Sequence, residues 1–298
     1  MSWNSNGPSS NVQDLEVKKQ FGYFDLLKKP VEIYLFVDPL CPECWALEPI
    51  IKKLTLEYGR LFTIRPILSG QLTSANQDAI EKHNYLKEVW EKTSSRTGMC
   101  CDGDLWLEDP ITYPSIVSIA IKAAELQGKK AGKKFLRKIQ EHAFINKKDI
   151  SKERNLLACA EEAELDLDEF KKDLYSNSAK KALQCDLKLA NEMEVDYIPS
   201  IVFFNETENE EGLKLSGEYS YEVYVNVLQQ MLQKDVKASE KPSLEAFSAH
   251  FQFFATKEVA VVYDWSNEKA LKEMKKLQLK RLVKQVPVKH GYFWKYIG

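Results

Sequence analysis

A short stretch near the start of the chain decides the fold: Val31-Glu32-Ile33-Tyr34-Leu35-Phe36-Val37-Asp38-Pro39-Leu40-Cys41-Pro42-Glu43-Cys44. Its first half is almost entirely apolar and rich in β-branched and aromatic residues, which predicts a strand buried on both faces of a sheet. Asp38-Pro39-Leu40 ends the strand, and Cys-x-x-Cys then opens one amphipathic helix that ends near Gly59. A second strand follows over residues 62–68. This order of elements is the setting of dithiol chemistry rather than of half a zinc site.

Cys41 and Cys44 have the spacing that thiol–disulfide exchange requires. With Cys41 at a helix N-terminus, the exposed backbone N–H groups and the helix dipole stabilise its thiolate. Cys44, one turn later, can resolve a mixed disulfide. Two inert cysteines retained by the fold are the structural alternative, so both residues are redox candidates whose use is left open.

Beyond this unit, helical periodicity runs from about residue 75 to residue 193 in segments separated by Gly, Pro, Asn or Asp. Strands return at residues 200–204 and 213–217, and an amphipathic helix follows at residues 221–232. Strands at both ends with helices between them predict an α/β domain over residues 16–236, in which one sheet carries a large helical insertion over residues 75–193.

A polar stretch at residues 235–242 ends on proline and is a linker signal. Residues 243–298 then have a pattern of their own. The first predicted helix has apolar residues at helical spacing, namely Leu244, Phe247, Phe251 and Phe254. Two more helices follow, and two alternating segments flank Lys289-His290-Gly291, which is a hairpin signal. Three helices and a hairpin predict a small winged-helix-like domain.

Over roughly residues 30–236 the chain resembles the DsbA-like branch of the thioredoxin superfamily. The resemblance rests on the Cys-x-x-Cys unit, the helical block and the segment Tyr197-Ile198-Pro199-Ser200 before a strand. It implies that Pro199 has a cis peptide bond, faces the cysteines and lies where an extended segment of a bound protein can pair with the backbone. An ordinary trans proline at the start of the strand is the alternative.

The whole chain is similar to the YjbH/SpxH adaptor family of Gram-positive bacteria. The closer match rests on residues 37–45, Val-Asp-Pro-Leu-Cys-Pro-Glu-Cys-Trp, and on the ending Gly-Tyr-Phe-Trp-Lys-Tyr-Ile at residues 291–297. The resemblance implies an adaptor that delivers the transcription regulator Spx to the ClpXP protease, with no cofactor and no catalytic residue. Affinity would come from a few anchors. Trp45 and Trp106 are candidates if they are exposed, and a place in the core is the alternative for both.

Two departures from an oxidoreductase favour the adaptor. Leu35 stands where thioredoxin and DsbA carry a buried acid, and Glu43 stands where DsbA has a thiolate-stabilising histidine. The competing hypothesis is a cytoplasmic dithiol–disulfide oxidoreductase. In that enzyme Cys41 would be the nucleophile, Cys44 the resolving thiol and Pro199 the residue that positions the substrate.

Composition narrows the classes of function. The net charge is −2, and no stretch approaches the ~18 consecutive apolar residues that span a bilayer. Residues 1–15 form a polar lead that we expect to be disordered, and it shows no secretory signal. We therefore expect a cytoplasmic protein with no membrane partner.

The sequence favours neither a metal site nor a nucleic-acid interface. His83, His142, His250 and His290 have no ligand spacing, so no metal site is predicted. The adjacent Cys100-Cys101 is expected in a loop as free thiols; a zinc site shared with Cys41 and Cys44 is the alternative, although adjacent ligands fit a tetrahedron poorly. Residues 240–298 hold eleven Lys or Arg and six Asp or Glu. They lack an array for base readout, so we expect protein contact rather than nucleic-acid contact.

Overall fold

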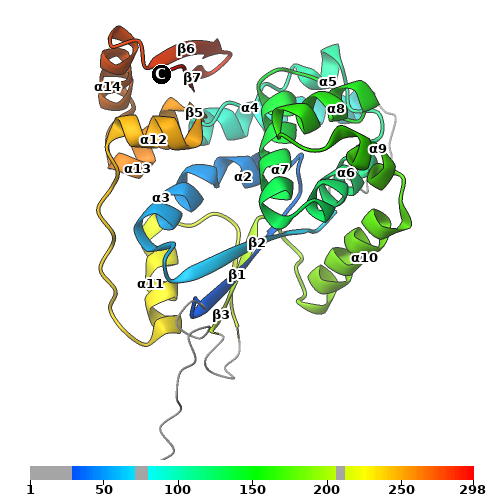
Figure 1. Ribbon diagram of the computed structural model, residues 1–298, viewed down its shortest axis with the longest axis horizontal. Coiled ribbons are helices and arrows are strands. Elements are labelled where there is room, and N and C mark those ends of the chain that lie inside the picture. Colours follow the sequence, from blue (N-terminus) through cyan, green and yellow to red (C-terminus); the bar gives the residue numbers. More distant parts are fainter. Residues whose placement is uncertain (1–28, 71–79, 206–211) are drawn as a thin grey trace, which may run out of the picture.

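The computed structural model describes residues 29–70, 80–205 and 212–298, so the predicted lead lies outside the described residues. A four-stranded sheet in the order β2-β1-β3-β4 stands at the centre (Figure 1). β1 pairs parallel with β2 and antiparallel with β3, which pairs antiparallel with β4. The strands are β1 (Val31–Val37), β2 (Phe62–Leu68), β3 (Ser200–Asn205) and β4 (Leu213–Ser216).

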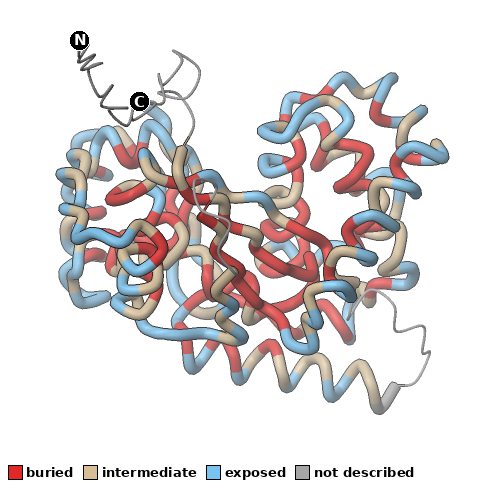
Figure 2. Tube along the Cα trace, turned by 90° about the horizontal axis from the view of Figure 1, so that it is seen from below, coloured by how far each residue is buried: buried red, intermediate tan, exposed pale blue. Residues whose placement is uncertain are grey.

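The central strand β1 is buried on both faces, as its composition predicted. Val31, Ile33, Leu35 and Val37 belong to the main core cluster, whereas Phe36 packs with Ile67, Val202 and Ala190 on the other face. Successive side chains of a strand point to opposite faces, so an apolar run can fill two layers at once. Figure 2 shows the buried residues running along the strands and along the facing sides of the helices.

The helix after the cysteines is interrupted, which the sequence analysis did not predict. It consists of α2 (Pro42–Ala46) and α3 (Glu48–Tyr58), and Gly59 ends α3. Pro49 lies in the first turn of α3 and has no N–H group to donate to the preceding turn, so a continuous helix would lose a backbone hydrogen bond there.

The helical insertion lies to one side of the sheet (Figure 1). It follows β2 and leads back into β3, as the periodicity predicted. Its helices are α4 (Ile80–Thr97), α5 (Leu105–Glu108), α6 (Pro114–Leu126), α7 (Lys129–Phe144), α8 (Glu153–Glu162), α9 (Leu167–Leu174) and α10 (Asn177–Glu192). After β4 comes α11 (Tyr221–Leu232), which packs against β3 and α3.

We name residues 243–298 the C-terminal unit. Its antiparallel sheet has the order β5-β7-β6, and the predicted hairpin is present as β6 and β7. The prediction that Phe254 continues the first helix was wrong: Gln252 ends that helix with a positive φ, and Phe254 lies in a strand. The elements are α12 (Leu244–Phe251), β5 (Phe253–Ala255), α13 (Thr256–Tyr263), α14 (Asn267–Leu279), β6 (Val283–Val288) and β7 (Gly291–Tyr296).

The C-terminal unit packs directly on the thioredoxin-like part of the chain. Ala255 and Phe293 belong to the main core cluster, and α13 makes extensive contact with α3. The polar segment before the unit is also held against α3, because Ser239 N–H donates to the Glu57 carbonyl at 2.8 Å. The segment is therefore attached to the last turn of α3.

Candidate functional site

The two motif cysteines lie at the N-terminus of α2, as predicted. Cys41 is the N-cap residue, and its Sγ accepts a hydrogen bond from Cys44 N–H at 3.3 Å. The Cys41 N–H in turn donates to the Asp38 carbonyl at 3.1 Å. Both cysteines are only 4% exposed. The structure therefore brings the thiols together but covers them with protein.

Burial also affects the acidity of Cys44. Desolvation raises the pKa of the Cys44 thiol well above its ordinary value of 9.0, and the adjacent Cys41 raises it further. A thiol in this environment stays protonated at neutral pH, and the thiolate is the nucleophilic form. Cys44 is thus poorly suited to attack a disulfide.

Asp38 is a buried acid at this site that the sequence analysis did not single out. It is fully buried beside the cysteines, and its carboxylate accepts a hydrogen bond from Leu40 N–H at 2.9 Å. Position 35, six residues before Cys41, is where thioredoxin and DsbA carry a buried acid, and in this chain it holds the apolar, buried Leu35. The sequence feature that could have identified Asp38 is its position as an acidic residue directly after a predicted buried strand.

Glu43, between the cysteines, is held by α4. Its carboxylate accepts a hydrogen bond from Thr93 Oγ1 at 2.8 Å and forms an ion pair with Arg96. Arg96 also pairs with Glu218 at 2.8 Å, on the segment after β4. The cysteine loop is therefore fastened to the helical insertion through the Glu43 side chain.

The Ile198–Pro199 peptide bond is cis, as the resemblance implied. Pro199 lines a cleft of about 590 Å³, and Glu43 of α2 also lines it. The remaining lining residues are Arg96, Tyr197, Glu218, Tyr219 and Ser220. The proline and the cysteine loop thus border the same cleft, while the role of Pro199 in positioning a bound protein stays a prediction.

Trp45, directly after the motif, is the point where the C-terminal unit meets the dithiol site. Its ring stacks on Phe144 and Phe293 with centroid distances of 5.5 and 6.3 Å, and the Arg137 guanidinium lies 4.2 Å from the ring centroid. Its indole N–H donates to the Cys100 carbonyl at 3.0 Å. Trp45 is fully buried and Trp106 is 6% exposed, so both were wrong candidates for exposed anchors.

A buried charge network forms a second connection. Glu258 on α13 accepts two hydrogen bonds from Arg137 of α7, at 3.1 and 3.2 Å, and forms an ion pair with Lys52 of α3. It also accepts the Ala255 N–H at 2.6 Å. Burial alone would raise the pKa of Glu258, but Arg137 and Lys52 lower it from 4.5 to about 2. One carboxylate therefore joins three parts of the fold.

The hairpin turn of the C-terminal unit makes a third connection. Lys289 Nζ lies 2.8 Å from Glu91, 2.6 Å from Asp104 and 3.3 Å from Asp102. These carboxylates form the one metal-like cluster among the described residues, and the lysine ammonium occupies its centre. His290 adds a contact with Glu91 at 2.6 Å. The cluster is an ion-pair network rather than a metal site.

Cys100 and Cys101 lie in a loop as free thiols, as predicted, and this loop is buried in the core. They are 1% and 0% exposed, and burial raises the pKa of Cys100 to about 11 and that of Cys101 well above 9.0. Within residues 29–70, 80–205 and 212–298, no three cysteine sulfurs lie close enough together to hold a metal ion. The shared zinc site is therefore not formed.

Three lysines of the C-terminal unit pair with nearby carboxylates. Lys276 pairs with Glu273 at 2.7 Å, and Lys280 pairs with Glu245 at 2.7 Å. Lys289 points inward, as described above. Among the described helices, none is long and apolar enough to cross a membrane.

Comparison with known proteins places this geometry in a family. The thioredoxin family model matches residues 34–226. The ClpXP adapter protein SpxH of Bacillus subtilis (strain 168) is 55% identical over 273 residues, 91% of each chain. The protein of the same name from Halalkalibacterium halodurans is 50% identical over 275 residues, 91% of this chain and 90% of that protein.

Among solved structures, the cytosolic disulfide reductase DsbM from Pseudomonas aeruginosa superposes with a TM-score of 0.52 at 16% identity, covering 68% of this chain and 97% of that chain. The likeness shows a shared thioredoxin-like, DsbA-like fold. The coverage also shows that DsbM corresponds to only part of this chain. With its thioredoxin domain and with relatives matched over nine-tenths of its length, the chain belongs to the SpxH family of ClpXP adapter proteins.

Proposed function

We propose that this protein is an adaptor that binds the transcription regulator Spx and promotes its degradation by the ClpXP protease. The observation that carries the proposal is the burial of the dithiol site: Cys41 and Cys44 are 4% exposed, and Trp45 is packed against the C-terminal unit. A substrate disulfide needs an in-line approach to an exposed thiolate. The name of relatives at 55% identity supports the client and the protease.

The proposal also assigns the parts of the chain. Residues 16–236 form the DsbA-like domain, and residues 243–298 form a winged-helix-like domain whose α-β-α-α-β-β element order supports that interpretation. The protein works in the cytoplasm, where the protease named in its relatives would meet it, and it has no enzymatic activity of its own.

The test is a reconstituted degradation assay with Spx, ClpXP and this protein. We compare the wild type with the Cys41→Ala/Cys44→Ala variant. Both are expected to accelerate Spx degradation equally, because the thiols are buried and serve the fold. Acceleration by the wild type alone would make the thiols part of the mechanism, and no acceleration by either would refute the adaptor.

The alternative, a cytoplasmic oxidoreductase using Cys41, Cys44 and Pro199, is favoured by the intact motif and by the cis proline. Its discriminating assay is the reduction of insulin by dithiothreitol. We expect the wild type to leave the rate of insulin precipitation unchanged. A strong acceleration that disappears in Cys41→Ala would support the enzyme instead.

A further inference from the structure

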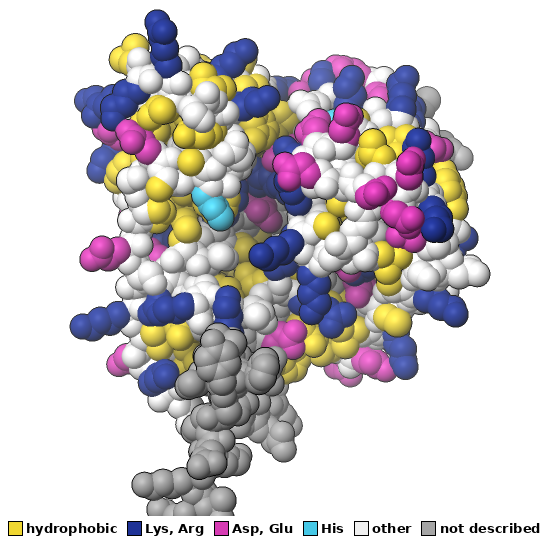
Figure 3. All heavy atoms as spheres, in the orientation of Figure 1, with side chains coloured by type: hydrophobic (Ala, Val, Ile, Leu, Met, Phe, Trp, Pro, Cys, Tyr) yellow, Lys and Arg dark blue, Asp and Glu magenta, His cyan; other side chains and the backbone are white. Residues whose placement is uncertain are grey.

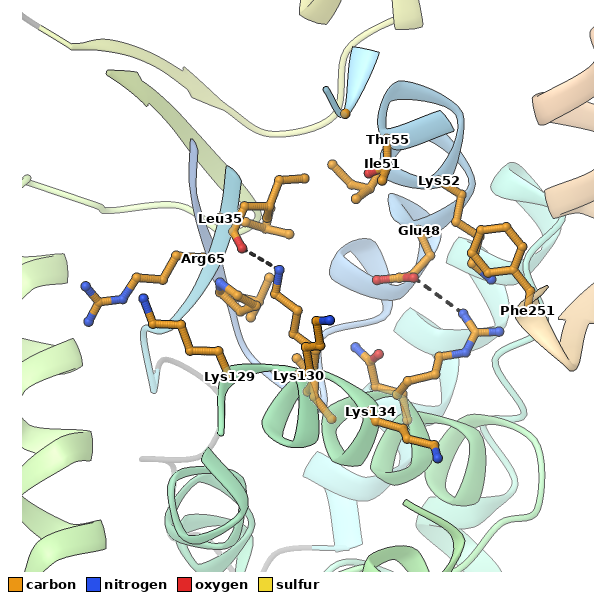
Figure 4. A pocket seen from close by; sticks show the side chains of 18 of the residues that line it. Leu35, Glu48, Ile51, Lys52, Thr55, Arg65, Lys129, Lys130, Lys134 and Phe251 are labelled. Carbon is orange, nitrogen blue, oxygen red and sulfur yellow. Dashed lines mark hydrogen bonds and ion pairs between the residues drawn. The ribbon is translucent and has the colours of Figure 1, made fainter. Parts of the chain in front are cut away.

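A basic groove lies on the face of the molecule between α3 and α7. Its volume is about 910 Å³, its floor comes from β1 and β2, and the segment around Phe251 closes one end. In Figure 3, Lys and Arg side chains gather around this hollow. Figure 4 shows Lys129, Lys130 and Lys134 projecting from α7, with Arg65 of β2 beside them. We call this feature the basic groove.

The charge of the basic groove is out of balance with the rest of the chain. Nine Lys or Arg side chains and three Glu side chains line it, although the whole protein has a net charge of −2. Two of the glutamates, Glu48 and Glu141, already pair with Arg137. Five of the nine cations pair with carboxylates of the described residues, some of them outside the groove, so the positive charge that remains comes from the other four.

Four lysines account for most of this surplus. Lys29 and Lys133 donate to the backbone carbonyls of Gly59 and Ile64, and Lys129 and Lys130 make no ion pair with any residue that the structure describes. Burial lowers the pKa of Lys133, and the neighbouring Lys29 and Lys129 lower it further. Glu48 and Glu125 act in the opposite direction but do not outweigh burial and the neighbouring lysines, so these like charges lie together in an arrangement that favours an external anion.

The position of these lysines on α7 is also unfavourable for the helix. The first turn of α7 contains Lys129 and Lys130 and no acidic residue, and its N-cap Gly128 provides no side-chain cap. Cations at a helix N-terminus are destabilised by the helix dipole. A local arrangement that costs stability, at the rim of a groove, is typical of a functional surface.

The apolar floor of the groove indicates what kind of anionic ligand would fit there. Apolar side chains such as Leu35, Ile51 and Leu136 lie between the cations, so the lining matches a segment that carries both carboxylates and apolar side chains. The aromatic side chains Phe251 and Phe253 are already covered, by Lys52 at 4.6 Å and by Phe293 at 5.1 Å. They do not offer the open stacking platform that single-stranded nucleic acid uses.

We propose that the basic groove is the docking site for an acidic segment of the client protein, with carboxylates at the lysines of α7 and apolar side chains on the floor. This rests on the proposed function, because the client is taken to be Spx. Charge complementarity at such a site speeds association and fixes the orientation of the bound segment. The groove would thus orient the client relative to the rest of the adaptor.

The test measures binding of purified Spx to the full-length protein by isothermal titration calorimetry. In Lys129→Glu/Lys130→Glu, we expect the affinity to fall by roughly tenfold or more, because two attractive contacts become repulsive. The control Lys180→Glu/Lys181→Glu makes the same charge change on exposed positions of α10, outside the groove, and should bind like the wild type. The charge-preserving Lys129→Arg/Lys130→Arg should retain binding.

Folding can be monitored separately in the same variants. Because acidic residues are favoured in the first turn of a helix, Lys129→Glu/Lys130→Glu should melt at a temperature no lower than the wild type. Equal Spx affinity of this variant and the wild type would overturn the docking site while leaving the proposed function intact. A wild type that does not bind Spx would overturn both. Loss of affinity for a short DNA duplex, with Spx binding unchanged, would assign the groove to nucleic acid and overturn the proposal.

Discussion

Among single residues, Glu258 contributes to the fold in a way that no nearby residue could replace. Its carboxylate is fully buried, receives two hydrogen bonds from Arg137 and pairs with Lys52. A buried charge is stabilised only while its partners remain in place, and removing one partner leaves the others uncompensated. Glu258 therefore holds α3, α7 and α13 in a fixed arrangement.

We expect Glu258→Gln to lower the free energy of unfolding by about 3 kcal/mol at neutral pH, because the amide removes the ion-pair partner of the buried Lys52 and one of the three carboxylates that pair with Arg137. The control is Glu245→Gln, which removes an exposed ion pair with Lys280 and should cost less than about 1 kcal/mol. Urea denaturation of the three proteins provides the measurement. Equal stability of the two variants would contradict the role of the network.

The pH dependence follows from the lowered pKa of Glu258. Its folded pKa of about 2 lies below the ordinary 4.5, so its stabilising contribution is complete above pH 4.5 and is lost as the pH falls towards 2. The difference in unfolding free energy between wild type and Glu258→Gln should therefore shrink over that range. A difference that stays constant would contradict the lowered pKa.

Among individual residues, the sequence predicted those that belong to a local motif. Cys41, Cys44 and Pro199 stand out because their roles depend on neighbours in the chain. Glu258, Arg137 and Lys52 could not be paired in advance, since they are far apart in sequence and nothing local marks a charge that will be buried. The burial of Trp45 has the same origin, because Phe293 covers it from the other end of the chain.

The helices α11 and α14 both begin at a serine, but only one of these serines makes a capping hydrogen bond. Ser266 begins α14 and accepts a hydrogen bond from Lys269 N–H at 3.2 Å. Ser220 begins α11 in the same extended backbone conformation but makes no capping hydrogen bond. Each serine also donates to a glutamate two residues later, Glu268 or Glu222, so the two positions differ mainly in the cap.

We expect Ser266→Ala to lower the free energy of unfolding by about 1 kcal/mol, because a backbone N–H of α14 loses its partner. Ser220→Ala is the matched control and should cost clearly less. Chemical denaturation followed by circular dichroism compares them. If both substitutions have the same effect, the cap at Ser266 contributes nothing beyond the exposed hydroxyl.

Element boundaries show why sequence patterns predict some features and miss others. The buried strand β1 was predictable because its seven consecutive residues are almost all apolar and are rich in β-branched and aromatic side chains. The break between α2 and α3 was missed because the apolar spacing continues across Pro49. Phe254 has helical spacing with Phe251, yet it lies in β5, where pairing with Trp294 of β7 outweighs the local periodicity.

For the whole molecule, the attachment of the C-terminal unit is the main result. The stacking of Phe293 on Trp45, the Glu258 network and the Lys289 ion pairs join the unit to three different parts of the thioredoxin-like domain. A polar linker predicts units that move independently. The contacts instead predict that the two parts unfold together.

We expect differential scanning calorimetry to show a single transition, with calorimetric and van't Hoff enthalpies that agree. The C-terminal unit has a core cluster of its own, but its Ala255 and Phe293 belong to the main core cluster and couple the two units. Two separate transitions in the wild type would contradict this coupling. Glu258→Gln is the informative variant, since loss of the network should lower the transition temperature or separate the two units.

The order of strands in the small sheet has a mechanical consequence. β7 is the last strand in the chain, yet it lies between β5 and β6 and is hydrogen-bonded on both sides. A force applied through the residues after Tyr296 would load both rows of hydrogen bonds in shear while Phe293 is still anchored in the core. The C-terminal unit should therefore resist mechanical unfolding by a force applied through these residues.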